Sequence, residues 1–168
     1  MSLMSDITKS ATIAIDGPVA SGKSVVGSEL ARRLGIRFLD TGMMYRACAW
    51  KILEMGLDET NEQAVAGLVN SLVIRMERRN GRDSLFVNGE DSTPHLKSAS
   101  VDRAVSQVSA VSAVRRTLVI LQRKIAEEKP IVMVGRDIGT VVLTDATLKI
   151  YLSATVEVRA RRRYLEMQ

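Results

Sequence analysis

The sequence predicts an α/β fold in three layers, with helices on both sides of a parallel core sheet and a small antiparallel β insertion. Three observations lead to this prediction. Residues 12–40 show the order strand, helix, strand, which builds parallel strands through a right-handed crossover. Two continuous apolar runs, 131–134 and 148–152, are typical of strands covered on both faces. Hairpin turn residues within 73–93 indicate the insertion.

The composition fits one globular domain over residues 12–168. Hydrophobic residues make up 46% of the 168 residues, which is enough to bury a core. Residues 1–11 lack the apolar centre of a secretion signal, so we expect them to be a tag remnant or a disordered tail.

The first strand is expected at Thr12–Asp16, followed by a helix that begins near Lys23 and ends at Gly35. Ile36–Asp40 then forms a second strand, which we expect to lie next to the first. The apolar residues of the helix are expected to point inward: Val25, Val26, Leu30 and Leu34.

A second helical pattern runs from Thr41 to Gly56, where glycine ends it. At about 100° per residue, Tyr45 lies at the edge of the apolar stripe and Arg46 lies opposite it, outside the core. The stripe itself consists of Met44, Ala47, Cys48, Ile52 and Met55.

Residues 73–93 contain three short β-like runs separated by RNGRD and by Asn88-Gly89, both with hairpin turn chemistry. A long helix follows from Ser100 to about Lys129, with a kink near Ser112, and Pro130 ends it. Beyond it, the two apolar strands flank a polar GRDIGT loop, and a last helix begins after Thr155, which can cap it.

Charge and cysteine content restrict the classes of partner. The chain has 24 Lys and Arg against 19 Asp and Glu, a net charge of +5 that suits small phosphate-bearing nucleotides. Only 4% of residues are aromatic, which argues against a nucleic-acid stacking surface, and no apolar run approaches membrane-spanning length. We therefore expect a monomer in the reducing cytoplasm that binds neither nucleic acid nor membrane. Cys48 is expected to be a buried apolar residue and His95 an exposed turn residue, and neither is expected to be chemically active.

The stretch from 17 to 24 fits the phosphate-loop pattern GxxxxGK[ST] and falls between a predicted strand and a predicted helix. Glycines let backbone amides turn inward, and the helix start adds positive charge at the same point. Lys23 would reach the outer phosphates of ATP, and the Ser24 hydroxyl would ligate Mg²⁺. The alternative interpretation of this stretch is an ordinary glycine-rich turn with a surface lysine. The nucleotide-binding residues are Gly17, Pro18, Val19, Ala20, Ser21, Gly22, Lys23 and Ser24.

A second group of polar residues, in LDTGMMYRA, lies where strands end, the edge at which open α/β sheets bind ligands. Asp40, Thr41, Tyr45 and Arg46 there suit a second substrate, although Thr41 could only cap its helix and Tyr45 could be core. Asp16 and Asp40 end neighbouring strands in this prediction, which allows either an outer-shell role around Mg²⁺ or simple loop capping.

Six stretches in this order closely resemble the bacterial cytidylate kinases, P-loop nucleoside monophosphate kinases: IDGPVASGKS, LDTGMMYR, VNGEDST, SQVSAVSAVR, VGRDIGTVV and LKIYLSATVEVRARRR. The resemblance spans nearly the whole chain from Thr12. It implies ATP-dependent phosphorylation of CMP and dCMP, with the insertion at 73–93 inside a nucleoside monophosphate-binding region at about 60–110. A nucleotide-binding regulatory protein on a kinase-like frame, and a P-loop kinase for another small acceptor, stay open as alternatives.

The resemblance also implies residue roles. Arg46, Arg115 and Arg136 would converge on the acceptor phosphate, although each could instead form an ion pair or a solvated helix face. Ser106 would touch the cytosine edge, and Asp137 would lie near the ribose and base. Thr41 and Tyr45 would complete the acceptor site.

Residues 155–168 match the start of the family's lid, whose arginines fold over the donor phosphates; the alternative is a solvated basic helix face. The arginines concerned are Arg159, Arg162 and Arg163. The expected catalytic residues are Lys23, Arg136, Arg159 and Arg163.

Two departures from the family pattern are visible. Val134 stands before GRD, where most members carry Asp or Glu, which removes a carboxylate expected to order the water shell of the magnesium ion. Gln168 falls inside the lid helix, so we expect an incomplete polypeptide whose run 148–152 lies at an open sheet edge.

Overall fold

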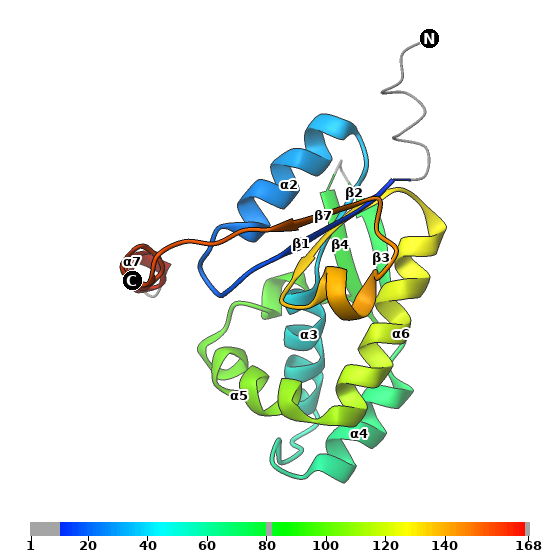
Figure 1. Ribbon diagram of the computed structural model, residues 1–168. Coiled ribbons are helices and arrows are strands. Elements are labelled where there is room, and N and C mark those ends of the chain that lie inside the picture. The colour runs from blue at the N-terminus through cyan, green and yellow to red at the C-terminus, as the bar shows by residue number, and fades with distance from the viewer. Residues whose placement is uncertain (1–10, 80–81, 167–168) are drawn as a thin grey trace. The chain divides into compact units, whose positions relative to one another are not determined.

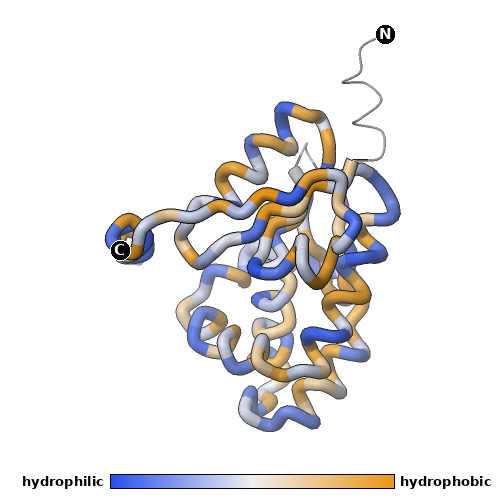
Figure 2. The backbone as a smooth tube through the Cα atoms, viewed as in Figure 1, coloured by the Kyte–Doolittle hydropathy of each residue, from blue (hydrophilic) through white to orange (hydrophobic). Residues whose placement is uncertain are grey.

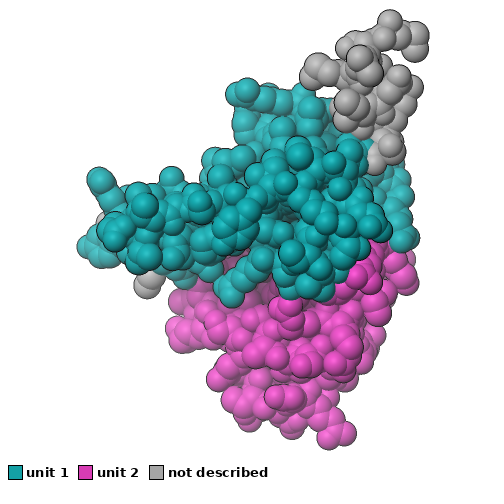
Figure 3. All heavy atoms as spheres, in the orientation of Figure 1, with its two compact units in different colours: residues 1–40, 126–168 teal, residues 41–125 magenta. Residues whose placement is uncertain are grey.

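The computed structural model describes residues 11–79 and 82–166. The chain forms two compact units, coloured separately in Figure 3. Unit 1 consists of residues 1–40 and 126–168, and unit 2 consists of residues 41–125.

Unit 1 contains a four-stranded parallel sheet in the order β2-β6-β1-β7. Figure 1 labels three of these strands, β1, β2 and β7. The expectation that the first two strands are neighbours is wrong, because β6 lies between them. A crossover helix spans more than one strand spacing, so it can leave room for a strand from much later in the chain. The elements are β1 Thr12–Asp16, α2 Lys23–Leu34, β2 Arg37–Asp40, β6 Ile131–Gly135 and β7 Leu148–Tyr151.

Helix α2 faces the sheet through small residues, Gly27 and Ala31. A Cβ atom added at Gly27 would lie 2.5 Å from Cγ1 of Val134, so glycine sets how closely the helix approaches β6. Val25 and Val26 are 74% and 46% exposed, and the prediction that they point inward is wrong. They lie off the narrow face that Gly27 and Ala31 define.

The sheet is buried unevenly. Every residue of β6 is buried, as the continuous apolar run predicts. Leu148 and Tyr151 in β7 are 48% and 71% exposed, so the prediction that both faces of this strand are covered is wrong, and β7 lies at the edge of the sheet. Ala11, expected in the tail, is buried and its carbonyl accepts from the Ile131 amide, so this residue belongs to the fold. Residues 1–10 lie outside the described residues.

Two further segments complete unit 1. The GRDIGT stretch is not only a polar loop, because Ile138–Val142 forms a short π-helical turn, η2, packed on β1 and β6. The last helix, α7, spans Val156–Glu166, and the Thr155 hydroxyl accepts from the Val158 amide at 3.4 Å, which confirms the predicted cap.

Unit 2 contains helices and a three-stranded antiparallel sheet in the order β3-β4-β5. The predicted hairpin at Asn88-Gly89 is confirmed, with φ of +52° and +85°, the left-handed conformation that a tight hairpin turn needs. The other predicted turn falls partly on residues 80–81, outside the described residues. The elements are α3 Thr41–Glu54, α4 Glu62–Ser71, β3 Ile74–Arg79, β4 Arg82–Val87, β5 Glu90–Asp91, η1 Thr93–His95 and α5 Ala99–Ala110.

Most of the predicted apolar stripe of α3 is buried. Met55 is the exception at 62% exposed, because the helix ends at Glu54 and Gly56, with φ of +64°, turns the chain away. Helix α4 was not predicted from the sequence. It begins after Asn61, whose Oδ1 accepts from the Ala64 amide at 3.1 Å.

The long helix expected from Ser100 to Lys129 is two helices, α5 and α6, bent by 94°. Val111 between them has extended backbone angles, so the chain breaks where a kink was predicted. Along α6, Ser112–Glu128, the tube in Figure 2 alternates between hydrophobic and hydrophilic colours, as in an amphipathic helix. Within the described part of the chain no helix alone is long and apolar enough to cross a membrane; α5 and α6 pass that test only when joined across their bend.

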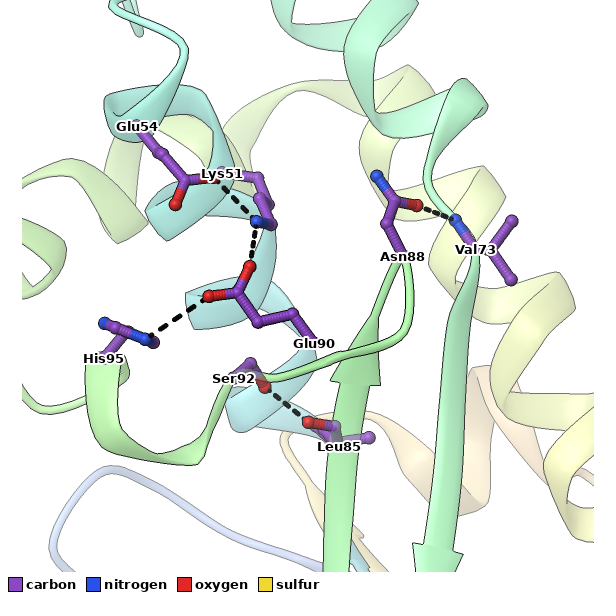
Figure 4. A network of polar contacts seen from close by, with 8 residues as sticks. All are labelled: Lys51, Glu54, Val73, Leu85, Asn88, Glu90, Ser92 and His95. Carbon is purple, nitrogen blue, oxygen red and sulfur yellow. Dashed lines mark hydrogen bonds and ion pairs between the residues drawn. The ribbon is translucent and has the colours of Figure 1, made fainter.

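A polar network joins β5 and η1 to α3 (Figure 4). Lys51 Nζ donates to Glu54 at 2.6 Å and to Glu90 at 2.8 Å. Burial acts to lower the pKa of Lys51, but the hydrogen bonds to the two carboxylates outweigh it and the pKa lies above its ordinary value. His95 is exposed, as predicted, yet its ring stacks on Trp50 with centroids 4.4 Å apart, so it has a packing role that the sequence did not indicate.

Candidate active site

The loop between β1 and α2 has the backbone shape of an anion-binding site. Gly17 has φ of +155°, and a Cβ atom there would lie 2.1 Å from the Leu152 carbonyl oxygen, so only glycine fits. Ala20 and Gly22 also have positive φ, at +59° and +100°, an arrangement typical of amide nests. Together with the start of α2, this geometry supports a phosphate cradle.

Lys23 is held over this loop. Its Nζ donates to the Pro18 carbonyl at 2.8 Å. Burial lowers the pKa of Lys23 below its ordinary value of 10.5, while Asp40 raises it, Arg136 lowers it and Asp16 raises it. Lys23 therefore lies within the electrostatic reach of two carboxylates and one guanidinium.

Ser24 and Asp40 form a direct pair: Ser24 Oγ donates to Asp40 Oδ2 at 2.5 Å. A hydroxyl and a carboxylate are hard oxygen groups of the kind that Mg²⁺ prefers, and Mg²⁺ usually takes only one or two protein oxygens beside phosphate and water. Among residues 11–79 and 82–166 there is no group of three or more His, Cys, Asp or Glu placed to hold a metal ion. The residues present therefore fit Mg²⁺ brought in with a nucleotide.

Asp16 makes a different set of contacts. Its Oδ1 accepts from the Ile138 amide at 2.6 Å and its Oδ2 from the Gly139 amide at 2.9 Å. The carboxylate is buried and caps the start of η2, as in the simpler of the two predicted roles. It also fixes the segment that carries Arg136, which is exposed, and Asp137, which precedes η2.

Of the three lid arginines, Arg162 contacts the phosphate loop. Its Nη1 donates to the Ala20 carbonyl at 3.3 Å and to the Ser21 carbonyl at 2.9 Å. Arg159 and Arg163, expected to be catalytic, are half-buried on the same helix. Arg159 Nε and Ser21 Oγ are buried without a hydrogen-bond partner.

In unit 2, Arg46 is held by its own neighbours. Its Nη1 donates to the Leu96 carbonyl at 2.9 Å and to Asp102 on α5, with which it forms an ion pair. Asp102 is not among the residues predicted from the sequence, because the tertiary packing of α5 on α3 brings it to Arg46. Thr41 is buried as the first residue of α3, and Tyr45 is half-buried.

The other acceptor residues lie on separate elements. Ser106 is exposed on α5 and Arg115 is exposed on α6, either side of the 94° bend. Arg46 and Arg115 belong to unit 2, whereas Arg136 belongs to unit 1. The convergence of the three arginines on one phosphate stays a prediction.

A parallel sheet whose first strand leads through a glycine-rich loop into a helix starting with Lys23 and Ser24 defines a P-loop nucleotide-binding protein of the α/β class. The family model described as cytidylate kinase matches residues 13–168.

Curated relatives agree with that match. The chain is 47% identical to a cytidylate kinase of Desulfitobacterium hafniense over 160 residues, which are 95% of this chain and 68% of the relative. It is 42% identical to one of Symbiobacterium thermophilum over 166 residues, 98% of this chain and 74% of the relative. It is 49% identical to one of Herpetosiphon aurantiacus over 160 residues, 93% of this chain and 70% of the relative. The chain belongs to the cytidylate kinase family of nucleoside monophosphate kinases, which confirms the resemblance.

Proposed function

We propose that the protein transfers the γ-phosphoryl group of ATP to CMP or dCMP and releases ADP with CDP or dCDP. The observation that carries the proposal is the loop from Gly17 to Ser24, with Lys23 over it, in a chain of the cytidylate kinase family. An oxygen of the acceptor phosphate attacks the γ-phosphorus in line. The bond from the γ-phosphorus to the bridging oxygen breaks, and ADP takes that electron pair.

The donor half of the reaction uses unit 1. The amides of the loop bind the phosphates of ATP, and Lys23 neutralises charge on the outer phosphates. The Ser24 hydroxyl would hold Mg²⁺, which supplies further charge neutralisation when it is bound. The lid arginines Arg159 and Arg163 would act on the developing charge, while Arg162 holds the loop itself.

The acceptor half draws on both units. Arg46, Arg115 and Arg136 would bind the phosphate of CMP as charge-assisted donors. Nucleoside contacts would come from Thr41, Tyr45, Ser106 and Asp137. Since the acceptor is already an anion, the scheme needs alignment and charge neutralisation rather than a general base, and exclusion of water prevents hydrolysis of ATP.

An acceptor panel tests the proposal against its rivals. The chain is incubated with ATP and Mg²⁺ plus CMP, dCMP, UMP, AMP or shikimate, and release of ADP and formation of the phosphorylated product are both measured. We expect turnover with CMP and dCMP above the others. Binding of ATP without transfer to any acceptor would favour a regulatory nucleotide-binding protein, and preference for a non-pyrimidine acceptor would overturn the assignment of CMP as substrate.

Because ATP and CMP are nucleotides of the cytoplasm, the proposal includes a cytoplasmic location for the protein.

A further inference from the structure

The Asp40 carboxylate lies beside the Ser24 hydroxyl at the end of β2. We propose that Asp40 is the positioning residue for the magnesium ion of the bound nucleotide, and that it acts through the Ser24 hydroxyl and through water. The inference rests on the proposed function only in that the nucleotide is bound as its magnesium complex. It assigns to β2 the acid that the resemblance led us to expect on β6.

The register of the sheet supports this assignment. Asp40 is the paired residue of Val134 across β2 and β6, just as Phe38 is the paired residue of Val132. Paired residues of parallel strands point to the same face, and a Cβ atom at Gly27 of α2 would meet Val134, Phe38 and Val132 at 2.5, 3.0 and 3.5 Å. Asp40 therefore lies on the α2 face, one strand spacing from Val134, and its carboxylate reaches the first turn of that helix.

The hydrogen bond to Asp40 orients the hydroxyl that would ligate the metal ion. A serine hydroxyl has one O–H donor and two acceptor lone pairs. Because Ser24 directs its proton to Asp40 Oδ2 at 2.5 Å, the lone pairs stay available for a cation. Outer-shell carboxylates fix metal ligands in this way, and their loss typically costs about 10- to 100-fold in metal affinity.

Asp16, the other carboxylate near Lys23, is already committed elsewhere. Each of its oxygens accepts from a backbone amide of η2, and freeing either oxygen would leave a buried amide unsatisfied. Asp16 therefore stabilises the fold at this edge of the sheet. The two aspartates thus have separate roles, and a matched pair of variants can distinguish them.

The test measures how much Mg²⁺ tightens the binding of ADP. The Kd of ADP is determined by calorimetry with excess Mg²⁺ and with EDTA, and the ratio of the two is the magnesium gain. We expect Asp40→Asn to reduce the gain about tenfold or more, with a much smaller change in the metal-free Kd. Asp16→Asn, which removes the same charge from the same unit, is expected to keep the gain and to lower the melting temperature.

A second variant keeps the test decisive if Asp40→Asn does not fold. Asp40→Glu retains the charge but moves the carboxylate by one methylene, so it too should lower the gain. In a double-mutant cycle, Ser24→Ala and Asp40→Asn should be less than additive, because they remove one interaction. A wild-type magnesium gain in Asp40→Asn or in Asp40→Glu, or an equal loss in Asp16→Asn, would overturn the inference.

The readout is independent of phosphoryl transfer, since ADP is the only nucleotide present. A chain that shows the magnesium gain but phosphorylates no CMP would refute the proposed function and leave the role of Asp40 intact. A chain that phosphorylates CMP and keeps its full gain in Asp40→Asn would refute only the role of Asp40.

Discussion

Arg46 has an orientation that depends on its neighbour Asp102. The guanidinium uses Nη1 for both the Leu96 carbonyl and Asp102, and its five donors leave other N–H groups able to meet a phosphate. We expect Asp102→Asn to raise the KM for CMP by roughly fivefold, about 1 kcal/mol, because the guanidinium loses the charge that orients it. The KM for ATP should not change.

Steady-state kinetics with each nucleotide varied in turn checks this expectation. Asp58→Asn serves as the matched control, because Asp58 lies in the same unit and its carboxylate accepts from the amide and hydroxyl of Thr60, two residues further along the chain. An unchanged KM for CMP in Asp102→Asn, or an equal rise for both nucleotides, would contradict the orienting role.

Cys48 offers a test of the core of unit 2. Burial raises the pKa of its thiol from the ordinary 9.0 to about 12. The folded state thus holds this proton at pH values where the unfolded chain has lost it, so stability should fall as pH rises above 9. At pH 8 we expect almost no reaction of the native protein with a thiol reagent and full reaction in denaturant.

The reaction of the thiol with a chromogenic disulfide reagent is followed by the absorbance of the chromophore that the reagent releases. The measurement is made with and without guanidinium chloride. The alkaline loss of stability should become smaller in Cys48→Ala, which has no thiol to titrate. Rapid labelling of the native protein at pH 8 would show that the side chain is accessible.

At the candidate site, local backbone features were more predictable from the sequence than contacts between distant residues. Gly17 of the predicted phosphate loop was predictable because the local backbone requires glycine there, with φ of +155°. Lys23 and Ser24 were predicted from the spacing of the motif. Asp102 and the bonds of Arg162 to the loop were not, since they join residues that are far apart in the chain. Two interpretations were open for Asp16, and only the positions of the η2 amides favour capping.

Among the helices and strands, the elements set by local chemistry were predicted most accurately. Asn88-Gly89 defined its hairpin, and Gly35 ended α2 with φ of +66°, as expected. The position of β6 between β1 and β2 was missed, because sheet order depends on pairing between distant segments. The break at Val111 was underestimated as a kink, since an apolar residue there looks like a continuous helix in sequence.

The packing of α2 on the sheet provides the clearest stability prediction. Gly27→Ala would force its new methyl group against Val134 and Phe38 at 2.5 and 3.0 Å, so we expect a loss of about 1–3 kcal/mol in the free energy of unfolding. Gly67→Ala is the matched control. It lies exposed in α4 with nothing within 4 Å, and the better helix propensity of alanine should add about 0.5–1 kcal/mol.

Chemical denaturation of the two variants measures both effects. Equal stabilities for Gly27→Ala and the wild type would mean that α2 can move away from β6 without cost. The shift of α2 should also weaken ADP binding, because the same helix carries Lys23 and Ser24 in its first turn.

For the molecule as a whole, the two units carry separate sets of cations. Unit 1 holds Lys23 and Arg162 at the phosphate loop, together with Arg136 of the expected acceptor set, and unit 2 holds Arg46 and Arg115. The net charge of +5 is spread along the chain and favours both anionic nucleotides alike. On the proposed function, discrimination between donor and acceptor therefore comes from these local groups and not from overall charge.

This separation predicts selective loss of ligand stabilisation. A nucleotide at 100 times its Kd stabilises the folded state by about 2.7 kcal/mol, which for a chain of this size corresponds to a rise of roughly 5–10 °C in melting temperature. Lys23→Ala should lose most of the rise produced by ATP with Mg²⁺ and keep that produced by CMP, and it should also abolish transfer. Arg46→Ala should do the reverse for binding, because its guanidinium belongs to the acceptor half. The melting temperature of each variant is measured with each nucleotide, at matched multiples of the wild-type Kd. If either variant loses the rise produced by ATP and also the rise produced by CMP, the donor and acceptor halves are not independent.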